Sequence, residues 1–426
     1  MTKKERVTAL ARFNLLKGFE DIYPPEVFIW QWIETKAKEH FNLYNYEEIK
    51  LPIVESTDLF TRGIGEGTDI VEKEMYSFQD KSGRLLTLRP EGTASMVRCY
   101  VENNLFNRPS PQKFFYYGPM FRYERPQKGR QRQFYQIGAE ALGIDNPAIE
   151  AEMLLMLSRL LKTLGLNSLN IEINSIGCDD CRPQYKKELR SFFEDKKSHL
   201  CVDCNRRYES NPLRILDCKV TNCIESRQGV PVLAQFLCPN CSRHYSALKG
   251  FLDEFQLRYV QNDNLVRGLD YYTRTTFEIT TEALGAQKAV CAGGRYDRLV
   301  EQFGGPSTPA VGFAIGVERI VALLKDNYKE AQRESVFIAI IDEKAEKKAH
   351  KIAEDLRDKG IVVSVNFGKG SLKNQLRKAD RLNSSHVIIL GEEELSRDKL
   401  SWKNLRNHTQ GEGKIDEFLT NIEVKA

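Results

Sequence analysis

The sequence lacks the features that would place a chain in or across a membrane. No apolar run approaches the length of a membrane span, and the opening residues MTKKERVTALARF contain no secretory apolar core. We therefore expect a cytoplasmic protein. Net charge is also small. The formal value of +4 does not by itself indicate a nucleic-acid partner, so any such binding must come from local basic clusters.

Histidine is scarce as well, and no internal repeat or low-complexity tract is visible. The six histidines show no triad-like grouping, so the pattern does not favour catalysis by a histidine-activated nucleophile. With 41% hydrophobic and 29% charged residues, the composition is that of an ordinary globular protein. The length of 426 residues exceeds what one hydrophobic core usually supports and predicts two or three domains.

Cysteine is almost confined to residues 178–241, which hold eight of the ten cysteines. They form the pairs Cys178/Cys181, Cys201/Cys204, Cys218/Cys223 and Cys238/Cys241, all with CxxC spacing except the wider third pair. In a reducing compartment such pairs indicate thiolate metal ligands rather than disulfides. We expect at least one structural zinc site of four thiolates. The spacing fits one or two sites and does not decide which pairs meet; free thiols without metal are the alternative.

Residues 114–143 (FFYYGPMFRYERPQKGRQRQFYQIGAEALG) predict a β-hairpin, because side-chain type alternates along both arms and a basic loop joins them. One face gathers Arg122, Glu124, Gln136 and Glu140 around Gly138, which has no side chain to fill the space. The residues expected to face the core are Tyr135, Ile137, Ala139 and Ala141. Burying the polar face empty would be costly. We interpret it as the floor of a pocket for a polar ligand; a solvated sheet face with a basic turn is the alternative.

Other segments predict elements that carry polar side chains. Residues 87–93 (TLRPEGT) predict a strand that ends at Pro90 and a helix that begins after Thr93, with Glu91 and Thr93 pointing into a site. Capping of that helix by Thr93 is compatible with this interpretation. Residues 25–40 predict a helix, and residues 46–54 (YEEIKLPIV) a strand that Pro52 restricts to an edge or bulge.

The segments after the cysteines predict a strand region, a glycine turn and a strand–helix unit. Residues 265–279 (LVRGLDYYTRTTFEI) place an arginine beside a glycine and two tyrosines before a strand. Residues 291–297 (CAGGRYD) predict a glycine turn that lets backbone approach a ligand. In residues 310–324 (AVGFAIGVERIVALL) small residues leave one strand face flat, and Arg319 lies in the first turn of a helix, where phosphate is favoured.

From about residue 334 the pattern changes to alternating strands and helices. Strands are expected at 336–341, 362–365 and 387–390 and helices at about 343–358 and 371–382, which predicts a small α/β domain with a parallel sheet. This domain carries a group of basic residues: Lys369, Lys373, Arg377, Lys378 and Arg381. They could contact phosphates. A run of charges on a helix is more often a solvated face, so these residues alone do not predict RNA binding.

Several of these stretches resemble histidyl-tRNA synthetases, a family of class II aminoacyl-tRNA synthetases. FRYERPQKGRQRQFYQIGAE is similar to motif 2 of that family, with Tyr135 where the family has His. The 265–279 stretch resembles its histidine signature, 310–324 its motif 3, the first helix and strand its motif 1, and NPLRILDCK (211–219) its insertion.

The resemblance implies an α+β fold, in which helices flank an antiparallel class II sheet. It also implies a cysteine-rich inserted domain and a C-terminal α/β anticodon-binding domain. The expected divisions are 1–177 and 256–330 for the two parts of the catalytic domain, 178–255 for the insertion and 331–426 for the anticodon-binding domain. The insertion would contact the acceptor arm of tRNA, and its basic residues for this are Arg206, Arg207 and Arg214.

The implied function is that of a histidine–tRNA ligase. It would activate L-histidine with ATP and Mg²⁺ to histidyl-adenylate, and transfer histidine to the 3′ end of tRNA(His) with release of AMP and pyrophosphate. A homodimer is expected. The implied catalytic residues are Arg122, Arg267 and Arg319. Those for histidine are Glu91, Gly92, Thr93, Arg122, Gln136, Glu140, Arg267, Tyr271, Tyr272 and Tyr296. Those for ATP are Arg122, Glu124, Arg130, Arg267 and Arg319, and those for the tRNA acceptor are Arg125, Gln127 and Arg132.

Two other functions are compatible with parts of the sequence. The synthetase-like regulatory subunit of ATP phosphoribosyltransferase shares the catalytic fold, but it lacks the C-terminal domain and usually the arginine–tyrosine signature, and both are present here. A zinc-knuckle RNA-binding protein with a degenerate catalytic domain is the third possibility. Histidine-dependent pyrophosphate exchange separates an enzyme from both.

Overall fold

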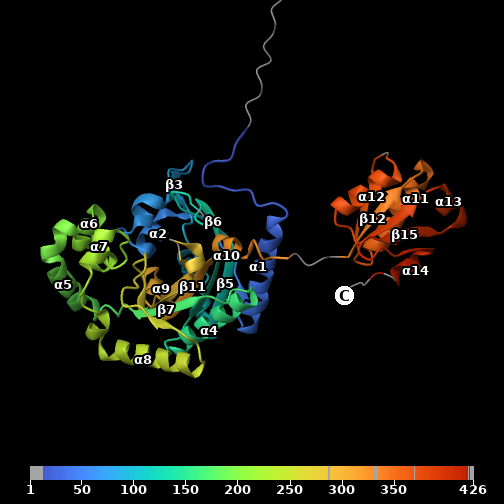
Figure 1. The fold of residues 1–426 in the computed structure, drawn as a ribbon. Helices are drawn as coiled ribbons and strands as arrows, with labels where there is room; N and C mark the ends of the chain where they lie inside the picture. Colours follow the sequence, from blue (N-terminus) through green and yellow to red (C-terminus); the bar gives the residue numbers. More distant parts are fainter. Residues whose placement is uncertain are drawn as a thin grey trace, which may run out of the picture. The chain divides into compact units, whose positions relative to one another are not determined.

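The computed structural model describes residues 13–127, 129–285, 288–329, 334–368, 370–420 and 422. The chain divides into two compact units, residues 1–328 and residues 329–426, whose elements are shown in Figure 1. The predicted loose tail, residues 1–12, and the basic residue Lys369 lie outside the described residues. Among the helices of the described part, none is long and apolar enough to cross a membrane.

An eight-stranded sheet forms the centre of the first unit, in the order β1-β5-β6-β11-β10-β9-β7-β8. The strands are β1 (Glu47–Glu48), β5 (Gln112–Phe121), β6 (Gln133–Leu142), β7 (Asn170–Ser175), β8 (Val260–Gln261), β9 (Thr273–Thr280), β10 (Ala289–Arg295) and β11 (Ala310–Gly316). The six inner strands pair antiparallel, whereas β1 and β8 lie parallel to their neighbours at the edges. The predicted hairpin is confirmed as β5 and β6, with Phe121 opposite Gln133.

One face of this sheet packs on helices and forms the main core. The helices are α1 (Glu26–Leu43), α4 (Ala148–Thr163), α8 (Pro239–Glu254) and α10 (Val317–Leu324). The predicted inward face of β6 is confirmed, because Ile137, Ala139 and Ala141 are buried in this core and Tyr135 packs against it. Tyr135 lies against Trp30, with ring centroids 5.2 Å apart. Since alternate residues of a strand point to opposite faces, the other face is left for polar side chains.

Smaller elements border that polar face. They are a three-stranded sheet of β2 (Val54–Ser56), β4 (Leu85–Leu88) and β3 (Tyr76–Gln79), the helices α2 (Thr57–Ile64), α3 (Thr93–Glu102) and α9 (Leu299–Gln302), and a short π-helix η1 (Ile70–Glu74). The strand predicted at 46–54 is wrong, because β1 and β2 belong to different sheets and the chain between them is not a strand. Pro52 falls in this break, where it has no N–H to donate to a ladder.

The predicted glycine turn at residues 291–297 is also wrong. Residues 291–295 belong to β10, between β9 and β11. A Cβ at Gly293 would lie 2.3 Å from the backbone oxygen of Gly312, and one at Gly294 would lie 2.5 Å from that of Thr275. The glycines therefore allow close approach of neighbouring strands rather than a turn around a ligand.

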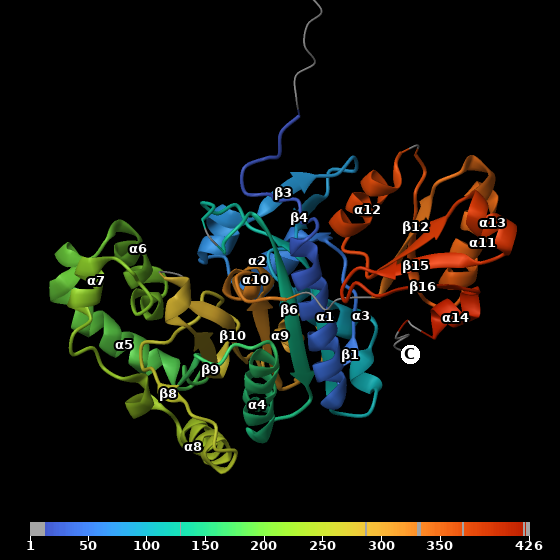
Figure 2. The same cartoon turned by 45° about the vertical axis from the view of Figure 1, so that its right-hand side comes forward.

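The cysteine-bearing segment adds the helices α5 (Arg182–Phe193), α6 (Val202–Ser210) and α7 (Thr221–Ser226), which Figures 1 and 2 show grouped together beside the sheet. A 3-10 turn, η4 (Pro212–Ile215), follows α6. The segment ends in α8, whose residues Tyr245, Leu248 and Leu252 enter the main core. The segment thus leaves the sheet and returns to it through one helix.

The second unit contains a five-stranded sheet in the order β13-β12-β14-β15-β16. Its elements are β12 (Ser335–Ile340), α11 (Glu346–Arg357), β13 (Val362–Val365), α12 (Leu372–Arg381), β14 (His386–Leu390), α13 (Glu392–Arg397), β15 (Leu400–Asn404), β16 (Gln410–Gly413) and α14 (Ile415–Leu419). The predicted parallel arrangement is confirmed for β13, β12 and β14. It is wrong for the sheet as a whole, because β15 and β16 pair antiparallel.

Candidate active site

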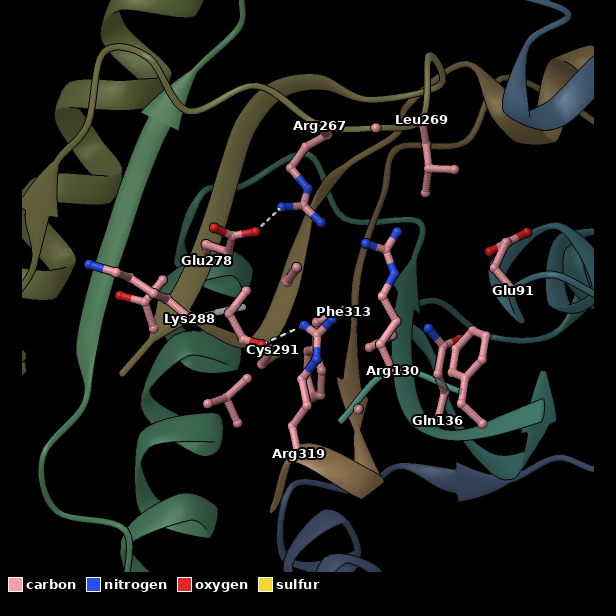
Figure 3. A pocket seen from close by; sticks show the side chains of 18 of the residues that line it. Glu91, Arg130, Gln136, Arg267, Leu269, Glu278, Lys288, Cys291, Phe313 and Arg319 are labelled. Atoms are coloured by element: carbon pink, nitrogen blue, oxygen red, sulfur yellow. Dashed lines mark hydrogen bonds and ion pairs between the residues drawn. The ribbon is translucent and has the colours of Figure 1, made fainter. Parts of the chain in front are cut away.

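A cavity of about 620 Å³ opens on the polar face of the first unit, over β6, β11, β10 and β9. Four arginines line it, from four separate parts of the sequence: Arg122, Arg130, Arg267 and Arg319. In Figure 3, Arg130, Arg267 and Arg319 extend into the same space from different sides, with Glu91 and Gln136 on a further wall. Of the other predicted site residues, the cavity is also lined by Thr93, Glu124, Tyr271 and Tyr272.

Arg122 and Arg319 are half-buried and have no carboxylate partner among the described residues. The Nε of Arg122 donates to the backbone oxygen of Pro90 at 2.8 Å, and its guanidinium lies over the Phe134 ring. The Nη1 of Arg319 donates to the backbone oxygen of Ala289 at 2.5 Å. Burial lowers the pKa of both arginines, and the neighbouring Arg130 lowers that of Arg319 further. The cavity therefore holds positive charge that the described protein groups do not neutralise.

The other two arginines have acidic partners. Arg267 forms a 2.7 Å ion pair with Glu278, and Arg130 pairs with Glu124. Burial is the largest single influence and lowers the pKa of Arg267, but the charge and hydrogen bond of Glu278 together with Tyr272 and Asp217 raise it, so the net direction is upward. Sequence reasoning missed Glu278. The alternation of β9 contained the signal, because Phe277 and Ile279 enter the core and leave Glu278 on the cavity face.

Glu140 is fully buried behind the cavity and is held by three hydroxyl groups. Its Oε1 accepts hydrogen bonds from Thr93 at 2.7 Å and Tyr116 at 3.2 Å, and its Oε2 accepts one from Tyr296 at 2.7 Å. Burial raises the pKa of Glu140 to about 8, although these hydrogen bonds oppose the shift. Glu140 and Tyr296 therefore lie behind the cavity rather than among its lining residues.

The open space predicted above Gly138 is occupied by Tyr116. A Cβ at Gly138 would lie 2.1 Å from the Tyr116 ring, and a Cβ at Gly92 would lie 2.3 Å from the same ring. The prediction that Gly138 leaves this space unfilled is thus wrong. The two glycines make room for a tyrosine whose hydroxyl reaches Glu140. Gly312 has a related role, since a Cβ there would overlap the Glu140 carboxylate.

The N-terminus of α3 is capped by Glu91 and not by Thr93, the alternative that the sequence left open. The carboxylate of Glu91 accepts hydrogen bonds from the backbone N–H groups of Thr93 at 2.7 Å and Ala94 at 2.8 Å. The Thr93 hydroxyl donates to Glu140 instead of capping the helix. Capping by Thr93 is therefore wrong, and Glu91 supplies the cap because its negative charge suits a helix N-terminus.

Gln136 provides a buried acceptor without a donor. Its side chain lines the cavity, and its amide oxygen has no hydrogen-bond partner in the described structure. Buried polar atoms are normally satisfied, so an unpartnered amide oxygen on a cavity wall indicates a ligand that donates a hydrogen bond. The adjacent loop of the hairpin keeps Arg125 and Gln127 exposed, whereas Arg132 packs over the Tyr123 ring and donates to the Glu124 backbone oxygen.

The eight clustered cysteines form two groups of four. One consists of Cys178, Cys181, Cys238 and Cys241, and the other of Cys201, Cys204, Cys218 and Cys223. The sulfur atoms within each group lie within 4.8 Å of one another. In the first group, the Sγ of Cys178 lies 3.6 Å from the Sγ of Cys181 and 3.9 Å from that of Cys238. The structure thus decides the pairing that the spacing left open.

Residues 205–217, which lie between the cysteines of the second group, join the insertion to the cavity walls. Arg207 forms a 2.6 Å ion pair with Asp69, and Arg206 a 2.7 Å ion pair with Glu72 of η1. Arg214 donates to the backbone oxygen of Gly268 at 2.9 Å. These three arginines were expected to be available to tRNA. Each of them also has a partner within the chain, and their contact with tRNA stays a prediction.

The same segment contacts the loop that carries Arg267. Besides the bond from Arg214 to Gly268, the Asn211 side-chain amide donates to Asp270 at 3.0 Å. The backbone N–H of Asp270 in turn donates to the backbone oxygen of Ile64 at 2.9 Å. Residues 211–214 therefore hold the loop 267–270 from the side opposite the cavity.

We expect Arg214→Ala to loosen this loop. Loss of one hydrogen bond of about 1 kcal/mol should raise hydrogen–deuterium exchange at the Asp270 amide about fivefold. Arg206→Ala is the matched control, because Arg206 pairs with Glu72 and makes no contact with the loop. Equal exchange at Asp270 in the two variants would contradict a holding role for Arg214.

A second prediction concerns pH. Because the pKa of Glu140 is raised to about 8 from its ordinary 4.5, the folded chain keeps a proton between these pH values that the unfolded chain has released. The free energy of unfolding should therefore fall as pH rises through this window, by at most about 1.4 kcal/mol per pH unit. Urea unfolding of Glu140→Gln should show a shallower fall between pH 5.5 and 7.5 than the parent. The exposed control Glu66→Gln should show the same pH dependence as the parent. If the free energy of unfolding changed with pH equally in all three proteins, the raised pKa of Glu140 would be refuted.

Comparison with known proteins extends over nearly the whole chain. A family model described as histidyl-tRNA synthetase matches residues 18–196 and 238–320, and a model described as anticodon binding domain matches residues 335–425. The chain is 52% identical over 415 residues to the histidine–tRNA ligase of Thermodesulfovibrio yellowstonii, covering 97% of this chain and 99% of that protein. It is 50% identical over 380 residues to that of Trichlorobacter lovleyi, covering 89% of this chain and 90% of that protein.

Solved structures agree with this result. The apo histidyl-tRNA synthetase of S. aureus superposes with a TM-score of 0.81 at 35% identity, covering 96% of this chain and 99% of that chain. A Bacillus halodurans protein described as an ATP phosphoribosyltransferase regulatory subunit/histidyl-tRNA synthetase has a TM-score of 0.64 at 22% identity, covering 91% and 99%, and supports the fold alone. The chain therefore belongs to the histidyl-tRNA synthetase family, class II aminoacyl-tRNA synthetases with histidine–tRNA ligase activity.

Proposed function

We propose that the chain forms histidyl-adenylate from L-histidine and ATP in the large cavity, and then transfers histidine to the 3′ end of tRNA(His) with release of AMP. The convergence of four arginines on one cavity, two of them without acidic partners, is the observation that carries this proposal. Adenylation brings the carboxylate of histidine against the α-phosphate of ATP. Because both groups are anions, fixed positive charge lowers the barrier.

The arginines divide between the two reacting anions. Arg122 and Arg267 contact the histidine carboxylate and the α-phosphate, and Arg319 with Arg130 contacts the distal phosphates. Arg267 is paired with Glu278 before substrate binds, so binding turns part of its guanidinium toward the new anion. Preorganised cations of this kind need little reorganisation during the reaction.

Mg²⁺ fits the same cavity. The carboxylates of Glu278 and Glu318 line its wall, and carboxylate oxygens are the ligands this ion prefers. When bound, Mg²⁺ supplies charge neutralisation at the phosphates.

Recognition of histidine uses the polar groups on the opposite wall. The unpartnered amide oxygen of Gln136 accepts a hydrogen bond from the α-ammonium group. In its ionised form Glu140 has about four acceptor positions, and its three hydroxyl donors leave one for an imidazole N–H. Because Glu140 lies behind the cavity and keeps a proton below about pH 8 in the empty protein, this contact requires the ring to pass the present cavity wall and favours the ionised carboxylate. Tyr272, which lines the cavity, donates to the other ring nitrogen. An amino acid without both ring nitrogens would leave these groups unpaired and be rejected.

The remaining predicted residues act through these groups. Gly92 admits the Tyr116 ring, Glu91 fixes the start of α3 so that Thr93 reaches Glu140, and Tyr296 orients the Glu140 carboxylate. Tyr271 packs against Tyr272, with ring centroids 4.7 Å apart. The exposed side chains of Arg125 and Gln127 remain available to the acceptor stem.

Histidine-dependent exchange of pyrophosphate into ATP tests this assignment. We expect Arg267→Ala to lower kcat/KM for exchange by about 10²–10³-fold, the range for loss of one preorganised transition-state donor. The matched control Arg258→Ala, at an exposed arginine in the same part of the chain, should stay within twofold. Near-normal exchange by Arg267→Ala would overturn its role, and absence of histidine dependence in the parent would overturn the proposed function.

We also propose that each cysteine group holds one zinc ion and that the chain forms a homodimer. Four thiolates around zinc at about 2.3 Å have sulfur–sulfur separations of about 3.8 Å, close to the 3.6 and 3.9 Å observed in the first group and the 3.9 Å between Cys201 and Cys218 in the second. Four thiolates leave no open position, so the zinc would be structural. For the dimer, the small sheet exposes Val54, Phe78 and Leu85, an apolar surface that a second copy would cover.

Native mass spectrometry tests both points. Protein purified without chelator should give a species of two 49.0 kDa chains that carries two zinc ions per chain. Cys204→Ser should reduce the count to one per chain, whereas Cys99→Ser, outside both groups, should leave it at two. Metal-free parent protein would remove the zinc proposal, and a monomer at micromolar concentration would remove the dimer.

A further inference from the structure

A second cavity, of about 320 Å³, lies directly behind the loop that carries Arg267. It shares Val266, Arg267, Leu269 and Tyr272 with the large cavity, so the loop 265–272 separates the two spaces. Its far wall comes from the insertion, through α5 and the segment 210–214. A ligand there would lie next to the reacting groups without occupying the space of ATP or histidine.

The walls of this second cavity carry an excess of positive charge. The cations are Arg182, Lys186, Arg214 and Arg267, and the acid among the lining residues is Asp270. Arg182 donates to the backbone oxygens of Ile176 at 3.3 Å, of Gly177 at 3.4 Å and of Tyr272. Backbone carbonyls orient this guanidinium but do not neutralise its charge.

Lys186 is the clearest unsatisfied group. It is half-buried, and it forms no hydrogen bond or ion pair with any residue that the structure describes. Burial lowers the pKa of Lys186, and the charge of Arg182 lowers it further. The negative charge of Asp270 offsets part of this and raises the pKa of Lys186, but it is one acid among several cations, so a further anion beside Lys186 and Arg182 would lower the cost of burying them.

Acceptors lie beside these cations. They are the side-chain oxygen of Asn211, which is buried without a hydrogen-bond partner, and the Asp270 carboxylate, which accepts one bond from Asn211. The Nε of Arg214, also buried without a partner, is a donor. The combination of cations for an anionic group with oxygen acceptors for a hydroxyl matches a ribose phosphate. Free phosphate, whose protonated forms also carry a hydroxyl donor, shares this chemistry, and the experiment below separates the two sources.

We propose that the second cavity binds the phosphodiester backbone at the 3′ end of the tRNA, with Lys186 and Arg182 on phosphate and Asn211 and Asp270 on ribose hydroxyls. This rests on the proposed function, which requires the terminal ribose to reach the adenylate in the large cavity. The linkage that precedes this ribose must then lie just outside that cavity. Contacts to the 2′-hydroxyl would also select RNA over DNA.

The test compares Lys186→Ala with Lys187→Ala, the next residue of α5, which is exposed and does not line the cavity. Charge-assisted contacts contribute enough that kcat/KM for tRNA in aminoacylation should fall about 10- to 100-fold in Lys186→Ala. The fold-decrease in histidine-dependent pyrophosphate exchange should be at least ten times smaller than the fold-decrease in aminoacylation. Lys187→Ala should stay within twofold in both reactions, and Lys186→Arg should recover most of the loss.

Salt dependence gives a second readout that a structural defect would not produce. Loss of one phosphate contact should reduce the slope of log affinity for tRNA against log salt concentration by about 0.7 in Lys186→Ala. Pyrophosphate is the other source of a phosphate group. A higher KM for pyrophosphate in exchange, with unchanged kinetics for tRNA, would assign the cavity to that product and overturn the RNA proposal.

Two further outcomes would also overturn the proposal that the second cavity binds the 3′ end of the tRNA. One is an equal effect of Lys186→Ala on aminoacylation and exchange, and the other is an equal effect of the two lysine variants on tRNA. If the parent protein shows no histidine-dependent exchange, the proposed function fails separately. Direct binding of tRNA to the full chain then decides, and equal Kd values for the two lysine variants would exclude the site.

Discussion

Uncompensated positive charge inside a partly desolvated cavity is the constraint on which the rest of the first unit depends. Arg122 and Arg319 are half-buried, and backbone carbonyls rather than carboxylates hold them in place. A carbonyl fixes the direction of a guanidinium and leaves its charge available to a ligand. Such a site costs stability in the empty protein, and the surrounding sheet must be rigid enough to keep the cations together.

The sheet provides this rigidity through small residues on its polar face. Gly138 and Gly312 of the sheet, with Gly92 at the start of α3, leave space that Tyr116 and Glu140 fill, so the polar groups behind the cavity are in close contact. Glu140 is satisfied by three hydroxyl groups from three different elements. A polar cluster in which every member is satisfied favours one arrangement, because breaking any of its bonds would leave a buried polar group unpaired.

The insertion is coupled to the same site rather than attached beside it. Arg207 and Arg206 form ion pairs with Asp69 and Glu72, respectively. Arg214 donates a hydrogen bond to the loop that carries Arg267. The second cysteine group encloses this segment of the chain, since its members flank residues 205–217. The order of the insertion and the position of a reacting arginine are therefore physically linked, and the second cavity lies at their junction.

Much of this could be predicted from the sequence, because it depends on local periodicity. The arms of the β5–β6 hairpin, the core-facing residues of β6 and α10, and the strand–helix turn at 88–93 follow from the side-chain pattern of a short segment. Elements with weak patterns were missed or misplaced. The glycine-rich stretch in β10 gave the signal of a turn, and the short polar strands β15 and β16 gave little signal at all.

What the sequence by itself determined was which residue types occupy which face of each element, since neighbours in the chain fix that through the backbone period. Only the tertiary structure decided which distant groups meet. It paired Cys178 and Cys181 with Cys238 and Cys241, placed Glu278 against Arg267, and set Asp69 opposite Arg207. The partners of these cysteines and of Arg207 lie many residues away along the chain. Their contacts depend on how whole elements pack, a property that no local pattern of side chains encodes.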